Sequence, residues 1–201
     1  MRMNLPNQLT LARCFLAAVF VVLMSFPHTA LYAVAYVVFT VAAITDYYDG
    51  KIARRDNLIT NFGKLMDPVA DKILMVSAFV MLMNVPELVV PGWTVVAILA
   101  REFLVTGARS LAAADGVVLS ANNYGKAKTV TQMVYVFVFL AAAILLRLAL
   151  PLFSQETGAV LVAWLRGVSR AGMVLVALLT IYSGVQFGWV NWKALKLHDL
   201  S

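Results

Sequence analysis

The sequence is poor in charge, and it contains little cysteine or histidine. Charged residues are 13% of its 201 residues, with one cysteine and two histidines. The lone Cys14 excludes a disulfide scaffold, and so few soft ligands exclude a zinc cluster. The apolar set AVILMFWYC makes up 62% of the chain, which excludes a disordered protein. Because a soluble fold this small cannot bury so much apolar surface, the sequence predicts an integral membrane protein.

Long uncharged runs predict membrane-spanning helices. Residues 14–45 contain no Asp, Glu, Lys or Arg, a run too long for a signal peptide, and Pro27-His28 divides it into two helices of about 20 residues. Four further apolar runs follow at 73–86, 88–112, 129–146 and 171–192. The first of these reaches spanning length only if its helix begins near Asp67. We therefore expect an all-α membrane protein of six transmembrane helices, with 1–201 as a single domain.

The distribution of basic residues predicts the orientation. Six spans place both termini on one side, which would carry thirteen Lys and Arg residues, whereas the other side would carry Arg147, Arg166 and Arg170. The positive-inside rule then places both termini in the cytoplasm. The net charge of +6 follows from this topology and from anionic lipid headgroups, so it indicates no nucleic-acid partner. We expect 157–170 to be an outer-surface segment that leads into the last span.

Half of the ten acidic residues fall between positions 46 and 71. Asp46 and Asp49 are three residues apart, and Asp67 and Asp71 are four apart, so each pair shares one face of a helix. We expect the first pair to end the second helix and the second pair to begin the third, with 50–66 as the cytoplasmic connection. Two antiparallel neighbours joined in this way would bring four carboxylates together at the inner edge of the membrane.

Four carboxylates at such short range predict a cation site. They repel one another unless a cation lies between them, and oxygen ligands favour Mg²⁺ or Mn²⁺. Two such ions about 3.5–4 Å apart form the usual clamp for displacement at phosphorus. The small residues Gly50, Ala53 and Gly63 allow a flat ligand to approach closely, and Arg54 is a cation beside the expected anion.

Other interpretations stay open for this region. Asp67 before Pro68 has the pattern of a helix N-cap, and Asp49 before Gly50 could mark the end of a helix. Acidic residues in helices also mark ion paths, so a divalent-cation transporter is a different functional class to consider. The sequence disfavours it, because the carboxylates gather at one edge of the membrane and no second acidic cluster continues across.

Eight residues of this region resemble the signature of the CDP-alcohol phosphatidyltransferases. All eight are present at the expected spacing: Asp46, Asp49, Gly50, Ala53, Arg54, Gly63, Asp67 and Asp71. At ordinary residue frequencies a chance match is on the order of 10⁻⁸ for a chain of this length. The resemblance implies the six-helix membrane fold of that family, which is commonly homodimeric.

Further segments resemble one branch of the family, the phosphatidylglycerophosphate synthases. They are Asn4 to Arg13, Ala100 to Phe103 with Arg109, and Gly125 to Thr129 with Gln132. The similarity ends at about residue 132, and the remainder matches only as apolar helix. In that remainder, Gly184 and Gly188 form a small-xxx-small pair suited to a helix contact or a dimer seam.

The resemblance implies a reaction and its residues. The donor would be CDP-diacylglycerol, the acceptor sn-glycerol 3-phosphate and the leaving group CMP, at a cytoplasmic site of the inner membrane. Asp46, Asp49 and Asp67 would ligate one metal ion, and Asp46, Asp67 and Asp71 the other. Asp71 would also accept the proton of the attacking hydroxyl. Besides the small residues, the positions expected to bind the donor are Arg54, Thr60, Asn7 and Thr10. Inositol phosphate, serine and phosphatidylglycerol remain alternative acceptors.

Charge placement predicts the acceptor site. Arg101 and Glu102 lie about nine residues into a span that begins near Trp93, where exposure to lipid would be costly. We expect four cations to bind the glycerol-phosphate dianion, with Glu102 holding an arginine in place: Arg101, Arg109, Lys126 and Lys128. In the structural alternative, Arg101 and Glu102 join two helices and the lysines are membrane anchors.

Overall fold

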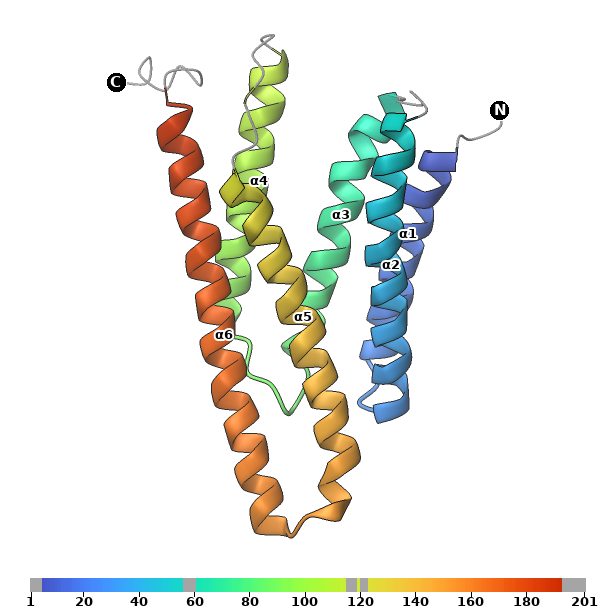
Figure 1. The fold of residues 1–201 in the computed structure, drawn as a ribbon, viewed down its shortest axis with the longest axis vertical. Helices are drawn as coiled ribbons and strands as arrows, with labels where there is room; N and C mark the ends of the chain where they lie inside the picture. Colours follow the sequence, from blue (N-terminus) through green and yellow to red (C-terminus); the bar gives the residue numbers. More distant parts are fainter. Residues whose placement is uncertain (1–4, 56–60, 115–118, 120–122, 193–201) are drawn as a thin grey trace.

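Six long helices make up the described part of the chain in a computed structural model (Figure 1). The structure describes the backbone of residues 5–55, 61–114, 119 and 123–192, and the side chains within these ranges except at 5–7, 46–55, 61–68, 71, 114 and 123–127. The helices are α1 (Leu5–Met24), α2 (Thr29–Arg55), α3 (Asn61–Leu82), α4 (Gly92–Ala114), α5 (Asn123–Ala149) and α6 (Gln155–Val190), and a short 3₁₀ helix, η1 (Leu150–Leu152), follows α5. The predicted all-α architecture of six helices is confirmed.

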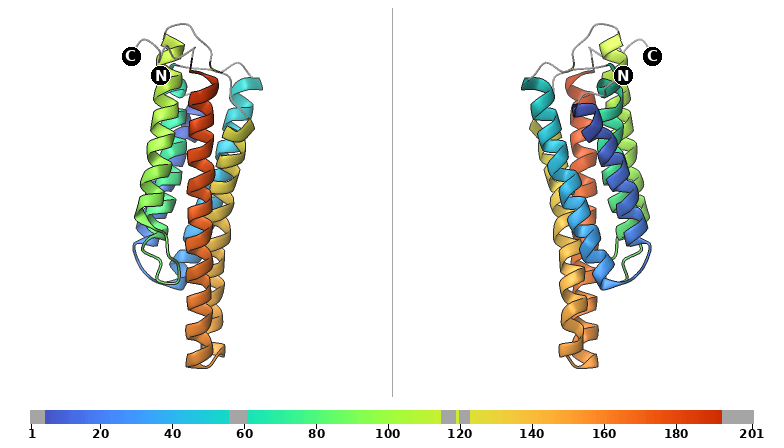
Figure 2. Two further views of the ribbon diagram at one scale, coloured as in Figure 1. Left: turned by 90° about the vertical axis from the view of Figure 1, so that its left-hand side faces the viewer. Right: turned by 90° about the vertical axis from the view of Figure 1, so that its right-hand side faces the viewer.

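The helices run alternately in opposite directions and form two groups of three. In the first group α1 packs on both α2 and α3, and in the second α6 packs on α4 and α5. Contacts of α5 with α2 and α3, and of α3 with α4, join the groups. The start of α1 and the end of α6 lie at the same end of the molecule, which we call the terminal end (Figure 1). At the opposite end, the hairpin of α5 and α6 projects beyond the other helices (Figures 1 and 2).

The break between α1 and α2 falls where Pro27-His28 predicts it. Helix α1 ends at Met24, and the Ser25 N–H still donates to the carbonyls of Val21 and Val22, at 3.0 and 3.2 Å. Proline cannot donate a backbone hydrogen bond, and it disfavours helical geometry at the residue before it. The chain therefore reverses here and starts α2 at Thr29.

The predicted end of α2 is wrong. The helix does not stop at Asp49 and Gly50 but continues to Arg55. One glycine inside a helix costs about 1 kcal/mol relative to alanine, which is too little to end a helix of 27 residues that packs along α1.

The predicted start of α3 is wrong for a similar reason. The helix begins at Asn61 rather than near Asp67, so 56–60 separate the two helices instead of 50–66. Asp67 is therefore an interior residue of the helix and not its N-cap. Pro68 fits the first turn of a helix best, but a packed helix can also accommodate it in the interior at a cost of about 3 kcal/mol.

Residues 157–170 belong to α6, one continuous helix of 36 residues, so the expected segment and the last span form a single helix. Ser154 caps its start, since the side-chain oxygen accepts from the Thr157 N–H. At about 1.5 Å per residue the helix is ~54 Å long, well beyond the ~30 Å of a hydrocarbon core. Arginines at 166 and 170 do not interrupt the helix, and the position of 157–170 relative to the membrane stays a prediction.

Packed aromatic rings join the two helix groups. Apolar side chains also cover the outer surface of the bundle. The rings of Phe20 and Phe39 lie 5.7 Å apart, and those of Phe39 and Phe137 5.1 Å apart, which links α1, α2 and α5. On the outer faces Phe15 and Leu104 are 69% and 73% exposed. Such faces are typical of a membrane protein, because lipid replaces water around them.

By length and composition, two stretches of the described chain could each cross a membrane. They are Lys128–Leu152 and Gln155–Val190. Three shorter apolar stretches, Gln8–Met24, Thr29–Thr45 and Lys72–Leu82, continue into residues whose side chains lie outside the description. Helix number and membrane character thus agree with the sequence, while the side of the membrane on which the termini lie stays a prediction.

A polar cluster closes the end opposite the termini. Arg147 Nε donates to Glu87 Oε1 at 2.8 Å, Arg147 Nη1 donates to the carbonyl of Pro27 at 3.2 Å, and the guanidinium lies 4.5 Å from the ring centroid of Tyr32. Arg166 donates through two nitrogens to the carbonyl of Pro86. Two of the three basic residues on this side therefore tie the interhelical connections to the α5–α6 hairpin.

We expect Arg147→Ala to lower the thermal unfolding temperature of the detergent-purified protein. The change leaves the Glu87 carboxylate without its cation, and breaking such a pair typically costs about 3–5 kcal/mol when it is buried. Glu87→Ala should cost less, because Arg147 keeps its contacts with Pro27 and Tyr32. The double replacement should be less destabilising than the sum of the two single ones. Equal and additive losses would contradict this assignment.

Candidate active site

The four aspartates occupy matching positions near the terminal end. Asp46 and Asp49 precede the last residue of α2 by nine and six positions, and Asp67 and Asp71 follow the first residue of α3 by six and ten. At about 1.5 Å per residue, all four lie roughly 9–15 Å from the terminal ends of their helices. The two pairs thus share one level of the bundle, and α1 packs against both helices.

The side chains of these aspartates lie outside the described residues, so their convergence stays a prediction. The same holds for Asn7, Gly50, Ala53, Arg54, Gly63 and Lys126, which have described helical backbones only, and Thr60 lies wholly outside the description. Among the side chains that are described, no group of three or more His, Cys, Asp or Glu could hold a metal ion.

Helix α1 presents two buried polar residues at the same level. Thr10, an expected donor-binding residue, is 1% exposed, and so is Arg13. Arg13 follows the first residue of α1 by eight positions, which is about 12 Å along the helix. A buried guanidinium is stable only beside a counter-charge or several acceptors. The sequence predicts Arg13 as one of the thirteen basic residues of the inner side and does not predict its burial. Arg13 is, however, the last residue of the N-terminal segment that resembles the family.

Glu102 joins two of the cations that the sequence predicts for the acceptor. Its Oε1 atom accepts from Lys128 Nζ and lies 3.5 Å from Arg101 Nη1. All three side chains are largely buried, with exposures of 9% for Arg101, 17% for Glu102 and 8% for Lys128. Two cations around one carboxylate leave an excess of positive charge, which suits an anionic ligand.

Arg101 is held mainly by α6, and Glu102 contributes only the longer contact. Arg101 Nη2 donates to Ser183 Oγ at 2.8 Å, a shorter contact than the 3.5 Å to Glu102. The sequence predicts that Glu102 holds an arginine; it does contact Arg101, but its closer partner is Lys128. The serine was not predicted, because a single hydroxyl in an apolar run of sequence carries no distinctive signal.

Arg109 turns toward α6. Its guanidinium carbon lies 5.2 Å from the ring centroid of Phe187, a cation–π contact. The structure therefore brings Arg101 and Lys128 together through Glu102, whereas Arg109 lies two turns nearer the terminal end of α4.

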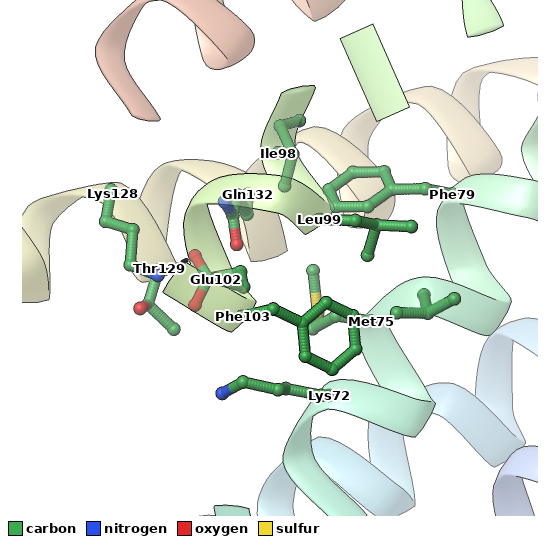
Figure 3. A pocket seen from close by; sticks show the side chains of 11 residues that line it. Lys72, Met75, Phe79, Ile98, Leu99, Glu102, Phe103, Lys128, Thr129 and Gln132 are labelled. Carbon is green, nitrogen blue, oxygen red and sulfur yellow. Dashed lines mark hydrogen bonds and ion pairs between the residues drawn. The ribbon is translucent and has the colours of Figure 1, made fainter. Parts of the chain in front are cut away.

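A pocket lies where α3, α4 and α5 meet, and Glu102 and Lys128 line it (Figure 3). Its third charged residue is Lys72, which follows Asp71 in α3 and extends toward the side where Glu102, Lys128 and Thr129 lie. The rest of the lining is polar at Thr129 and Gln132 and otherwise apolar: Met75, Val76, Phe79, Ile98, Leu99 and Phe103. One wall of the cationic pocket is thus the helix that carries Asp67 and Asp71.

Comparisons with known proteins give one matching family and several similar proteins. The family model for CDP-alcohol phosphatidyltransferase matches residues 3–185, so the expectation that the similarity ends at about residue 132 is wrong. A CDP-diacylglycerol–glycerol-3-phosphate 3-phosphatidyltransferase of Bacillus subtilis is 36% identical over 96% of this chain and 97% of its own length. A protein of the same name from Rickettsia typhi is 41% identical over 65% of this chain and 72% of its own. A probable phosphatidylglycerophosphate synthase of Mycobacterium tuberculosis is 40% identical over 68% of this chain and 65% of its own.

Proposed function

Because the chain belongs to the CDP-alcohol phosphatidyltransferase family, we propose that it transfers the phosphatidyl group of CDP-diacylglycerol to sn-glycerol 3-phosphate. The products are phosphatidylglycerophosphate and CMP. The observation that carries this choice of acceptor is the 36% identity, along 96% of the chain, to a relative named for that reaction. The cationic pocket supports it, because the acceptor is an anion.

The chemistry is a displacement at phosphorus. One of the two free hydroxyls of sn-glycerol 3-phosphate attacks the phosphorus that carries the diacylglycerol, a new P–O bond forms, and the P–O bond to CMP breaks. Asp71 accepts the hydroxyl proton as the bond forms. CMP leaves with the electron pair of the broken bond.

The two aspartate pairs fit a site for divalent cations. Carboxylate oxygens are the ligands that Mg²⁺ and Mn²⁺ prefer, and α2 and α3 carry the two pairs at one level. Asp46, Asp49 and Asp67 would hold one ion, and Asp46, Asp67 and Asp71 the second. When bound, the two ions would neutralise the pyrophosphate and stabilise the charge on departing CMP.

The rest of the donor site comes from α1, α2 and the residues that follow α2. Small residues at Gly50, Ala53 and Gly63 let the cytidine approach the backbone, and Arg54 supplies charge beside the pyrophosphate. Three polar residues complete this site: Asn7, Thr10 and Thr60. Buried Arg13 adds a cation at the level of the aspartates.

The acceptor binds where Glu102 joins Arg101 and Lys128, beside the pocket that Lys128 lines. Arg101 and Lys128 hold the phosphate dianion, and Lys126 adds a further cation from the first turn of α5. Arg109 attracts the anion from nearer the terminal end. The enzyme acts at the cytoplasmic face of the cell membrane, with both termini in the cytoplasm, as a homodimer.

A panel of acceptors with one donor tests this proposal. The purified protein in detergent with CDP-diacylglycerol and Mg²⁺ should release CMP with sn-glycerol 3-phosphate and not with inositol phosphate, serine or phosphatidylglycerol. A chelator should abolish the release, and added Mg²⁺ or Mn²⁺ should restore it. CMP release with another acceptor would overturn the acceptor assignment. Metal flux into vesicles without any CMP release would favour a transporter.

A further inference from the structure

We propose that Ser183 and Gly184 of α6 position the Arg101 guanidinium and thereby set the affinity for the acceptor. This inference rests on the proposed function, and it assigns a role to two residues of α6, a helix for which the sequence predicts no substrate-binding residue. The two residues are positioning residues, since they contact Arg101 and not the reacting atoms.

The Arg101 side chain packs directly against Gly184. A Cβ atom at position 184 would stand 2.7 Å from Arg101 Cγ, 3.5 Å from its Nε and 3.7 Å from its Cδ. The first distance is far below a normal carbon–carbon contact, and Cγ lies near the root of the side chain, so relief of the clash requires the whole Arg101 side chain or the helix to shift. Only glycine therefore allows Arg101 to cross α6 at this point.

Ser183 fixes the far end of the same side chain. Its hydroxyl is buried, with the residue 4% exposed, and it accepts from Arg101 Nη2 at 2.8 Å. The contact of Gly184 with the aliphatic part of Arg101 and the hydrogen bond between Ser183 and its guanidinium together fix the plane of that guanidinium. Orientation matters here, because a guanidinium binds a phosphate through a planar fork of N–H donors.

Polar contacts of the pocket region converge on one face of α6. Thr180, Ser183, Gly184 and Phe187 stand at spacings of three, four and seven from the first, so they share a face. Thr180 accepts from Gln132 Nε2 at 3.1 Å, Gly184 and Ser183 contact Arg101, and Phe187 lies under Arg109. This face therefore contacts the acceptor-site side chains of both α4 and α5.

Steady-state kinetics with both substrates test the proposal. Gly184→Ala should raise the KM for sn-glycerol 3-phosphate by up to about 100-fold, the scale of a 1 Å misplacement, and Ser183→Ala by about tenfold. The KM for CDP-diacylglycerol should change less than about threefold. Ser183→Thr, which keeps the hydroxyl, should return the acceptor KM toward the wild-type value.

The chain offers a matched control. Gly188 lies one turn further along α6, and a Cβ there meets no atom within 4 Å, so Gly188→Ala should keep the wild-type acceptor KM. Equal effects of the two glycine replacements, or equal shifts in both KM values, would overturn the proposal.

A double replacement gives a second test. Since Gly184 acts through Arg101, Gly184→Ala should add little in an Arg101→Ala background; a fully additive effect would also overturn the proposal. Failure of the proposed function is distinct, because the wild-type protein would then release no CMP with glycerol phosphate.

Discussion

Replacing Asp71 by asparagine is expected to lower the rate of CMP release by about 10²–10⁴-fold, the scale of a lost general base. Asparagine keeps the size of the side chain but cannot accept the proton, and it is a weaker cation ligand. The measurement is kcat with both substrates saturating, for protein whose thermal unfolding matches the wild type. Asp46→Asn, Asp49→Asn and Asp67→Asn should also lose most activity, since each removes one carboxylate of the site.

Asp56 is the control for these replacements. It is the remaining aspartate between positions 46 and 71, and it lies outside the eight-residue signature. Asp56→Asn should therefore keep the wild-type kcat. An Asp71→Asn enzyme with unimpaired turnover, or an Asp56→Asn enzyme as damaged as the others, would contradict the assignment of the quartet.

Replacing Arg101 by alanine is expected to raise the KM for sn-glycerol 3-phosphate by about 10–100-fold, the range for losing a hydrogen bond to a charged group. Arg101→Lys should give a smaller increase, because the charge remains and the planar fork does not. Arg109→Ala should act in the same direction, more weakly, since its guanidinium stacks on Phe187 and does not reach Glu102.

Arg170 provides the comparison for Arg101. It is an exposed arginine of α6, on the half of the helix away from the terminal end, so Arg170→Ala should leave both KM values unchanged. An Arg101→Ala protein that unfolds normally and keeps the wild-type acceptor KM would leave Arg101 with a purely structural role between α4 and α6.

The features of the fold that follow from composition and proline placement were predictable. Long uncharged runs give helices, and Pro27 separates α1 from α2 as expected. The ends of α2 and α3 were not predictable from Gly50 and Pro68, because packing along α1 outweighs the modest cost of one glycine or proline. Local signals mark helix ends reliably only where no tertiary contact opposes them.

The functional site, like the fold, was predictable only in part. Aspartates at fixed spacing carry their own signal, so the sequence predicts them as a site. It also predicts a partnership between Glu102 and an arginine, and the structure joins Glu102 to Arg101 and Lys128. Ser183 carries no such signal, and Gly184 carries only the small-xxx-small pattern of a helix contact, which does not name Arg101 as the partner. Their relation to Arg101 depends on a contact between residues 82 positions apart, and only the packing of α4 on α6 reveals it.

Counting the Mn²⁺ ions bound to the purified protein by electron paramagnetic resonance tests most directly whether the aspartates of α2 and α3 share divalent cations. In the presence of CDP-diacylglycerol, the wild-type chain should bind two ions. Replacing both Asp67 and Asp71 by asparagine should abolish the pair, while Asp56→Asn should keep it. A doubly substituted protein that still binds two ions would contradict this account, because other residues would then hold the cations.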